Sequence, residues 1–423
     1  MAGNSAVSAG TTHPRGFGAA DFIRWPLVPC RDLFELKYGK ALVASSRRPG
    51  RVPVYGTNGQ CGTHDTALFQ GPGVILGRKG QGPLGVEWCS RDYWVIDTAY
   101  SLVPRTDTVD LKYAYFLFKY IGLNHLKDGT SNPSLSRDTF GAQAIPMPSL
   151  KEQRSVVQVL STLDDKIELN RKMNETLEEM ARALFKSWFV DFDPVRAKAE
   201  GRQPYGMDAE TAALFPDSFQ DSPLGKIPKG WNVCPIGEVV QCLGGGTPRT
   251  KESKYWVGGM NPFVTPRDMS SLACPVLLDS ERHITDEGVA KISSGRLPAG
   301  TVLLSSRAPI GYLAIAEQSV SVNQGIIAMV CDGSLPNHYV LHWTRENMDA
   351  VEANAGGTTF AEISKKNFRP IPAIVPLETV SAAFTQQAGS LHERMVSNVK
   401  ESNTLAEIRD ALLPKLLSGE VRV

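Results

Sequence analysis

Several features that would identify common classes of protein are missing from this chain of 423 residues. It has no apolar run approaching the ~18 residues that a membrane-spanning helix needs, and its start lacks the apolar core of a secretion signal. Its seven cysteines are scattered and form no C-x-x-C pair, so neither a zinc site nor a disulfide framework is indicated. We therefore expect a cytoplasmic protein with reduced thiols, no bound metal and a disordered tail over residues 1–24.

An excess of one charge is also missing, because 45 Lys and Arg residues balance 44 Asp and Glu residues, for a formal net charge of +1. A nucleic acid would therefore have to be bound through a local patch. Neither G-x-S-x-G nor H-E-x-x-H occurs, and no G-K-[ST] follows the glycines at 244–246. The sequence Asn261-Pro262-Phe263 lacks the second proline of the amino-methyltransferase motif and predicts a turn. The chain thus shows no catalytic residues of its own.

The longest uninterrupted pattern lies between Ser149 and Trp188. It begins with an S-x-x-E capping box formed by Ser149 and Glu152, and no proline or glycine follows until Pro194. At alternating steps of four and three residues, apolar side chains form a heptad stripe that two asparagines interrupt. A helix of this length would extend about 58 Å at about 1.5 Å per residue. Its single apolar stripe requires a partner helix.

The partner lies in the same chain, because the sequence repeats itself. Phe140 and Phe368 are 228 residues apart, and the heptad stripe returns at this spacing; at a spacing of 226, Asp97 is matched to Asn323. Such long-period similarity indicates a tandem duplication of a globular unit followed by a long helix. The residues expected along the seam between the two helices are Leu163, Ile167, Asn170, Leu177, Leu184, Leu391, Met395, Asn398, Leu405 and Leu412. Asn170 is expected to lie opposite Asn398.

The two globular units mix short strands with helices. Their β-branched and aromatic runs alternate with glycine-, proline- and asparagine-rich turns, without regular βαβ alternation, which predicts an α+β fold. We expect two tandem mixed α/β domains separated by two long helices that pack as an antiparallel coiled coil, with a pseudo-twofold repeat. The expected boundaries are a first globular domain at 25–148, a spacer helix at 149–190, a connector at 191–226, a second globular domain at 227–376 and a second spacer helix at 377–417. Residues 111–121 are expected to form a buried helix.

Basic and amide side chains gather in the loops in which the two globular units differ. Lys and Arg neutralise phosphates, while Arg, Asn and Gln can pair with base edges, so these loops predict contacts to DNA. For any single residue a solvated loop position is the alternative, and the signal is that both units carry such loops. The predicted DNA-binding residues are Lys40, Arg47, Arg48, Arg51, Asn58, Gln60, Arg78, Lys79, Gln81, Arg249, Thr250, Lys254, Arg267, Arg307, Asn323 and Gln324.

A second candidate surface is apolar. Phe185, Trp188, Phe189 and Phe192 crowd one end of the first long helix. A large apolar patch that no other element covers marks an interface. We therefore expect these four side chains to dock a partner subunit, and the chain to be poorly soluble without it.

Specific segments carry a resemblance to a known family. They are N-P-S-L-S at 132–136, I-P-M-P-S-L-K-E-Q-R at 145–154, L-D-D-K-I-E-L-N at 163–170, M-N-E-T-L-E at 173–178, A-L-F-K-S-W-F-V-D-F at 183–192, I-P-K-G-W at 227–231 and L-L-P-K-L-L-S-G at 412–419. In these segments the chain resembles the specificity subunits of type I restriction–modification systems. One departure is that Leu377-Glu378-Thr379 lacks the capping box of the first helix.

The resemblance implies a non-catalytic role in DNA recognition. Each globular domain would be a target-recognition domain that reads one half of a split double-stranded DNA site, and the helices would form a spacer that docks two modification subunits. The complex would act as an adenine-N6 methyltransferase using S-adenosylmethionine and, with restriction subunits, as an ATP- and magnesium-dependent endonuclease. The chain itself would bind no cofactor.

From the residues alone, two other classes stay open. A coiled-coil scaffold with protein-binding globular ends is favoured by the near-zero net charge. A self-contained DNA methyltransferase is disfavoured by the missing cofactor motifs.

Overall fold

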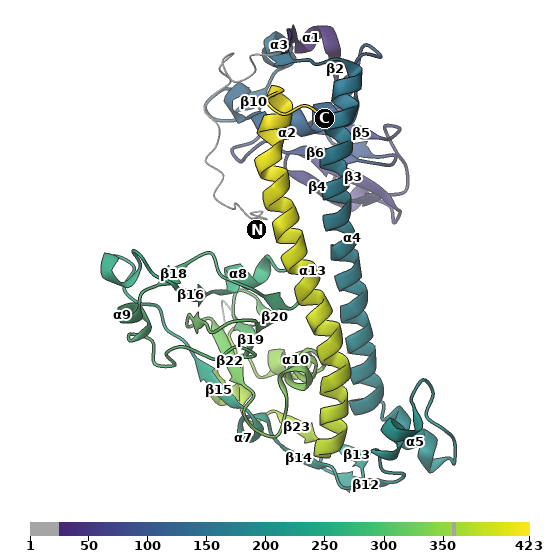
Figure 1. Cartoon of the computed structure of the whole chain (residues 1–423), viewed down its shortest axis with the longest axis vertical. Helices are drawn as coiled ribbons and strands as arrows, with labels where there is room; N and C mark the ends of the chain where they lie inside the picture. The colour runs from purple at the N-terminus through teal and green to yellow at the C-terminus, as the bar shows by residue number, and fades with distance from the viewer. Residues whose placement is uncertain (1–24, 358–360) are drawn as a thin grey trace. The chain divides into compact units, whose positions relative to one another are not determined.

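The computed structural model describes residues 25–357 and 361–423 (Figure 1). Contacts divide this part of the chain into two compact units, which we call the first unit (residues 25–167 and 403–423) and the second unit (residues 168–402). Each unit contains one globular domain and parts of two long helices, α4 (Leu150–Phe189) and α13 (Glu378–Ser418). Within the described residues, every helix is too short or too polar to span a bilayer. The predicted tail at 1–24 lies outside the described residues.

The globular domain of the first unit is built on two small sheets. A four-stranded sheet has the order β2 (Phe34–Tyr38), β8 (Ala99–Pro104), β5 (Gly73–Gly77), β6 (Val86–Cys89), and a three-stranded sheet has the order β4 (Gly59–His64), β3 (Val52–Gly56), β7 (Trp94–Val95). Two-stranded ladders join β1 (Leu27–Pro29) to β11 (Ala144–Pro146) and β9 (Lys127–Asp128) to β10 (Ser134–Leu135). The helices are α1 (Cys30–Leu33), α2 (Leu111–Ile121) and α3 (Arg137–Ala142). Asp110 caps α2 at 2.9 Å from the amide of Lys112, and its buried face confirms the predicted helix.

The second unit contains a larger version of the same domain. Its five-stranded sheet has the order β15 (Gln241–Gly244), β22 (Ile326–Val330), β19 (Val302–Ser306), β20 (Ile310–Ala316), β17 (Val276–Leu277), and its three-stranded sheet has the order β18 (His283–Ile284), β16 (Asn261–Val264), β21 (Ser321–Val322). β14 (Asn232–Pro235) pairs with β23 (Pro372–Val375). The helices are α7 (Ile236–Val239), α8 (Pro266–Ser270), α9 (Asp286–Val289), α10 (Asn337–Glu346), α11 (Met348–Ala353) and α12 (Lys365–Phe368). The turn predicted for Asn261-Pro262-Phe263 is wrong, because these residues form the buried strand β16.

The segment between α4 and this domain is folded rather than extended. It forms α5 (Asp193–Ala199), α6 (Ala209–Ala213) and the antiparallel ladder of β12 (Phe219–Ser222) with β13 (Gly225–Pro228). Phe215 and Ile227 of this segment are buried in the core of the second unit. The connector is therefore part of the second unit's core.

Strand order confirms the duplication. The order β2-β8-β5-β6 in the first unit matches β15-β22-β19-β20 in the second, and the parallel pair of β3 with β7 matches that of β16 with β21. The amide of Ile96 donates to the carbonyl of Tyr55, as the amide of Asn323 donates to that of Val264. Ile96 and Asn323 are therefore equivalent, so Asp97 corresponds to Gln324. The sequence match of Asp97 to Asn323 is one residue out of register.

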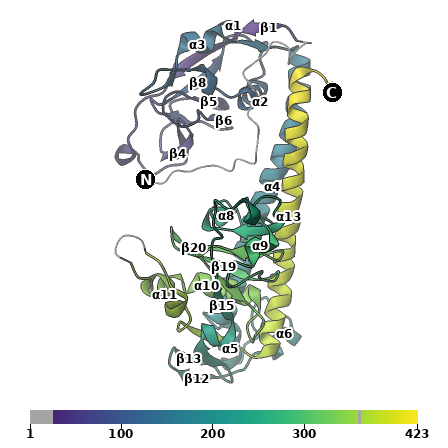
Figure 2. The ribbon, with the colours of Figure 1, turned by 90° about the vertical axis from the view of Figure 1, so that its left-hand side faces the viewer.

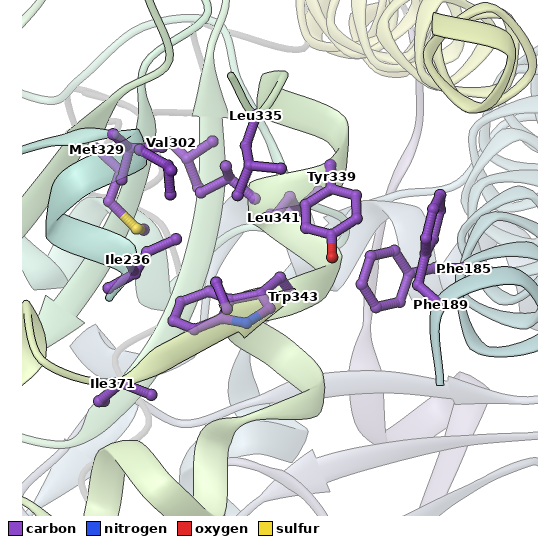
Figure 3. Packing of buried hydrophobic residues seen from close by; sticks show 14 of the residues in the cluster. Phe185, Phe189, Ile236, Val302, Met329, Leu335, Tyr339, Leu341, Trp343 and Ile371 are labelled. Atoms are coloured by element: carbon purple, nitrogen blue, oxygen red, sulfur yellow. The ribbon is translucent and has the colours of Figure 1, made fainter. Parts of the chain in front are cut away.

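The aromatic cluster at the end of α4 is the centre of the second unit's core. Phe185, Trp188, Phe189 and Phe192 are between 2% and 7% exposed. Figure 3 shows Phe185 and Phe189 pointing from α4 toward Tyr339 of α10, with ring centroids 5.1 and 4.9 Å from the tyrosine ring. The docking surface predicted from these four residues is therefore wrong, because the chain's own domain already buries them.

In each unit, segments of α4 and α13 lie side by side and antiparallel (Figures 1 and 2). The capping box is present at the start of α4, where the Glu152 carboxylate accepts from the amide of Ser149 at 3.1 Å. All ten predicted seam residues are buried or half-buried. In the first unit, Arg409 of α13 donates to the Asp164 carboxylate at 2.9 Å.

A buried polar layer joins the helices in the second unit. The amide Nδ2 of Asn398 donates to Oδ1 of Asn174 at 2.8 Å, while Nδ2 of Asn170 donates to the Glu401 carboxylate at 2.8 Å and to Oγ of Ser402 at 3.3 Å. Asn174 and Ser402 are equivalent in the repeat, so these contacts are twofold-related. Nδ2 of Asn170 also donates to the backbone carbonyl of Asn398 at 3.4 Å, so the two residues lie opposite each other as predicted. Their side chains do not pair with each other, because the pseudo-twofold axis passes between the side-chain pairs Asn170–Ser402 and Asn174–Asn398.

Candidate nucleic-acid interface

In the first unit, four loops meet at the strand ends that follow β5 and β7; we call them the first loop cluster. They are the turn at 57–58, the loop at 78–85, the residues at 96–98 and the loop at 129–133. Oγ1 of Thr57 donates to the carbonyls of Lys79 and Thr98 at 2.8 and 3.1 Å, and Nε2 of Gln81 donates to that of Ser131 at 2.9 Å. A Cβ at Gly77 would lie 2.3 Å from the Thr57 carbonyl oxygen, so only glycine permits this approach.

The first loop cluster brings together the predicted residues Asn58, Arg78, Lys79 and Gln81. Lys79 forms an ion pair with Asp97 at 2.9 Å. Arg78 has no ion-pair partner within the described residues, and the neutral amides of Asn58 and Gln81 stand beside it. Their side chains are exposed or half-buried and available to a ligand.

Sequence reasoning missed three residues of this cluster. Lys127 donates to the carbonyls of Gly80 and Gly82 at 3.0 and 2.9 Å and holds the loop. The Tyr38 ring meets both Arg78 and Arg137, although the three come from segments far apart in the chain. No local sequence signal marks them, since only the sheet order brings β2, β5 and α3 together.

The other basic residues predicted in this unit lie elsewhere. Arg51 precedes β3, at the opposite end of the β3–β4 hairpin from Asn58. Arg47 donates to the carbonyl of Cys61 at 2.6 Å, and its guanidinium fills the space above Gly62, so it holds the fold together. Exposed Lys40 lies beside β7, where its carbonyl accepts from Trp94, and Gln60 donates to the Gly62 carbonyl.

Arg48 is also engaged within the chain. Its guanidinium binds both carboxylate oxygens of Asp65 at 2.6 and 3.0 Å, and this hydrogen bonding lowers the pKa of Asp65 to about 2. The predicted cations Lys40, Arg47, Arg48 and Arg51 therefore do not form one patch.

The second unit contains the corresponding second loop cluster, formed by the residues at 244–247, 307–309, 323–325 and 362–365. It brings together the predicted residues Arg307, Asn323 and Gln324. Oγ1 of Thr247 donates to Gln324 at 2.6 Å, and Arg307 lies 3.5 Å from the Glu362 carboxylate. A Cβ at Gly245 would lie 1.7 Å from the Val322 carbonyl oxygen, so only glycine lets the two backbones approach this closely. This packing explains the glycine run at 244–246 without a phosphate-binding loop.

Four predicted residues of the second unit lie outside the second loop cluster, on the segments at 249–254 and on α8. Arg249, Lys254 and Arg267 each have a carboxylate between 3.4 and 3.7 Å away, from Glu252, Glu287 and Glu281 respectively. These pairs are exposed and weak. Thr250 is exposed beside Arg249.

The two loop clusters place cations at equivalent positions. The amide of Leu135 donates to the Arg78 carbonyl as that of Ile363 donates to Ser306, which makes Lys79 equivalent to Arg307. Arg137 and Lys365 both follow a capping serine at the start of a short helix. Each domain thus presents two equivalent cations beside amide side chains, a combination suited to phosphates and base edges. Among the described residues, no group of three or more His, Cys, Asp or Glu could hold a metal ion.

Comparisons with known proteins agree with this arrangement. The family model for the type I restriction modification DNA specificity domain matches residues 23–179 and 228–388. The chain therefore belongs to this family of DNA specificity proteins, whose members are non-catalytic.

Similar proteins cover most of the chain. It is 28% identical over 381 residues to the type I restriction enzyme HindI specificity subunit of Haemophilus influenzae, covering 78% of this chain and 82% of the relative. It is 29% identical over 335 residues to the MjaIX specificity subunit of Methanocaldococcus jannaschii, covering 76% and 72%. The crystal structure of the type I restriction–modification S subunit from M. genitalium has a TM-score of 0.56 at 16% identity and covers 93% of this chain and 96% of its own, which shows a shared fold.

Proposed function

We propose that the chain is the DNA sequence-recognition subunit of a type I restriction–modification complex, and that each globular domain reads one half of a bipartite duplex site. The observation that carries this proposal is the repeated loop cluster. Two domains of the same topology present cations at equivalent positions but differ in their amide and aromatic neighbours. Equivalent cations suit the uniform phosphate backbone, and the differing neighbours suit two different half-sites.

The helices α4 and α13 set the spacing between the half-sites and dock two modification subunits. The buried polar layer supports the first role, because its hydrogen bonds are satisfied in one register of the helices. Exposed apolar side chains on the helices support the second, since Leu169, Met180 and Ile408 are between 43% and 53% exposed. These residues replace the buried aromatic cluster as candidates for subunit docking.

Catalysis belongs to the partner subunits. The modification subunits would transfer a methyl group from S-adenosylmethionine to an adenine N6, and restriction subunits would use ATP and magnesium. This chain supplies the DNA sequence specificity of the complex.

The test is methylome sequencing of a host that expresses this chain together with its modification subunit. We expect one bipartite methylated motif. Replacing residues 231–375 by the equivalent domain of another family member should change one half of the motif and leave the other half unchanged, because each domain folds around its own core. A change in both halves, or an unaltered motif, would contradict separate reading. A coiled-coil scaffold without DNA recognition would leave the methylome the same with and without this chain.

A further inference from the structure

Tyr38 stands at the end of β2 with two guanidinium groups against its ring. Cζ of Arg137 lies 4.0 Å and Cζ of Arg78 4.8 Å from the ring centroid. The ring is 46% exposed and packs on Tyr100, whose hydroxyl donates to the Leu135 carbonyl at 3.1 Å. The Tyr38 ring is therefore held by Tyr100 and stays partly exposed to solvent.

Stacking on the ring leaves the arginines free to bind an anion. A cation–π contact uses the face of a guanidinium, while its N–H donors point outward from the edge. Arg78 uses one of these donors on the Asp97 carbonyl at 3.0 Å. The Arg137 side chain makes no hydrogen bond or ion pair within the described residues, and the Asp97 carboxylate is taken by Lys79. Two oriented guanidinium edges thus lack a carboxylate partner.

We propose that Tyr38, Arg78 and Arg137 form a clamp for a backbone phosphate of duplex DNA, an inference that rests on the proposed function and names one contact within it. A phosphodiester accepts paired hydrogen bonds from a guanidinium edge. The ring holds both edges in place before DNA arrives, which reduces the entropy lost on binding. Asp138 is exposed and has no ion pair with either arginine, so it does not close the site.

The second domain lacks this clamp. The register of β2 with β8 and of β15 with β22 makes Gly244 the equivalent of Tyr38, and Ser306 is the equivalent of Arg78. Only Lys365 is retained as a cation, with its Nζ 2.9 Å from where a Cβ of Gly244 would lie. The first domain therefore holds the DNA backbone more strongly than the second, and its half of the interface carries more of the salt dependence.

The experiment measures binding of the complex with modification subunits to a random-sequence duplex, by fluorescence anisotropy between 50 and 200 mM salt. Each phosphate contact contributes about 0.9 to the slope of log affinity against log salt. Arg137→Gln should reduce the magnitude of that slope by about 0.9. Between 50 and 200 mM salt, the wild type should therefore lose about 3.5 times more affinity than the variant does. Tyr38→Leu keeps both charges and should weaken binding about two- to fivefold with an unchanged slope.

Arg91→Gln is the matched control. Arg91 is an exposed arginine of the same domain, beyond the end of β6 that lies opposite the first loop cluster. It should leave the slope unchanged. Arg137→Lys, which keeps the charge but loses the paired donors, should preserve the slope and weaken binding, and it guards against a folding defect in Arg137→Gln.

Three results would overturn the clamp while the proposed function stands. One is a slope for Arg137→Gln equal to that of Arg91→Gln. The second is an unchanged slope with an altered methylated sequence, which would assign Arg137 to base reading. The third is an unaltered affinity for both Tyr38→Leu and Arg137→Lys. A wild-type complex that binds no duplex at all would instead refute the proposed function itself.

Discussion

The hydrogen bond between Asn174 and Asn398 offers a test of how the helix pair fixes its register. Both residues are at most 4% exposed. Nδ2 of Asn398 is the donor to Oδ1 of Asn174, and Oδ1 of Asn398 has no hydrogen-bond partner among the described residues. Leucine has the same branching at Cγ as asparagine, so Asn→Leu removes the polar atoms with little change in shape.

The two single changes and the double change should not be additive. Asn398→Leu leaves Oδ1 of Asn174 buried without its donor, which costs about 1–3 kcal/mol. Removal of the unpartnered Oδ1 of Asn398 offsets part of this, so we expect a net loss of about 1 kcal/mol. Asn174→Leu with Asn398→Leu removes both partners together and should be neutral or stabilising by about 1 kcal/mol. Asn174→Leu alone leaves Nδ2 of Asn398 buried without its acceptor and should also cost about 1 kcal/mol. The coupling free energy is then about 2–3 kcal/mol, well above the ~0.5 kcal/mol expected of independent sites.

The measurement is a double-mutant cycle by urea unfolding, followed by tryptophan fluorescence, with exposed Asn403→Leu as the control. Additive single effects would refute a cooperative polar layer. Methylome sequencing then tests register, because a slip of one heptad moves one helix by ~10 Å, or about three base pairs. The double variant should methylate sites with altered spacers. If it is more stable than the wild type yet keeps a single spacer length, the polar layer does not fix the register.

Two further predictions follow from groups that the fold engages internally. Arg47→Ala should destabilise the first unit by about 1–2 kcal/mol, because it removes a donor to the Cys61 carbonyl. Arg48→Ala should cost clearly less, because its ion pair with Asp65 is exposed, and equal melting shifts for both variants would contradict this. Burial lowers the pKa of His338 to about 4 and that of His342 to about 3. Since the unfolded chain binds protons near pH 6.5 that the folded chain does not, unfolding free energy should fall by on the order of 1 kcal/mol per histidine for each pH unit between about 6.5 and 4. Thermal unfolding across this range checks it, and His342→Leu should have a shallower pH dependence; an equally steep profile would exclude that histidine as a source.

The parts of the fold that the sequence predicted are those set by local periodicity. The heptad stripe, the capping box of Ser149 and Glu152, and the repeat at Phe140 and Phe368 are each visible without knowing which strands pair. They were enough to predict two long antiparallel helices and a duplicated α+β domain. Heptad periodicity alone did not place the twofold axis, so the side chain of Asn398 was expected to pair with Asn170, whereas it pairs with Asn174 one turn away and Asn170 reaches only its backbone carbonyl.

The candidate site could be predicted only in part, because strand order decides which loops meet. Arg78, Lys79 and Gln81 stand together in the sequence and in the first loop cluster. Tyr38 and Arg137 join them through the pairing of β2 with β8 and of β8 with β5, which no local pattern reveals. Charge alone was equally insufficient for Arg47. Its positive charge predicted a contact to DNA, but its guanidinium instead stabilises the β3–β4 hairpin through the Cys61 carbonyl. The aromatic residues of α4 were misassigned because their apolar character fits a domain core as well as an interface.

The duplication explains how one scaffold can hold two different reading surfaces. Substitutions at Tyr38 and its equivalent Gly244, or at Arg78 and Ser306, lie at strand ends, where they change the loop cluster without altering strand register. The cores below tolerate this because the strand residues before these ends are buried within each domain. A change at one loop cluster therefore costs little stability and does not reach the core of the other unit. Recognition of each half-site can then diverge separately, while the equivalent cations Lys79 and Arg307 are kept for the phosphate backbone, which is the same in every duplex.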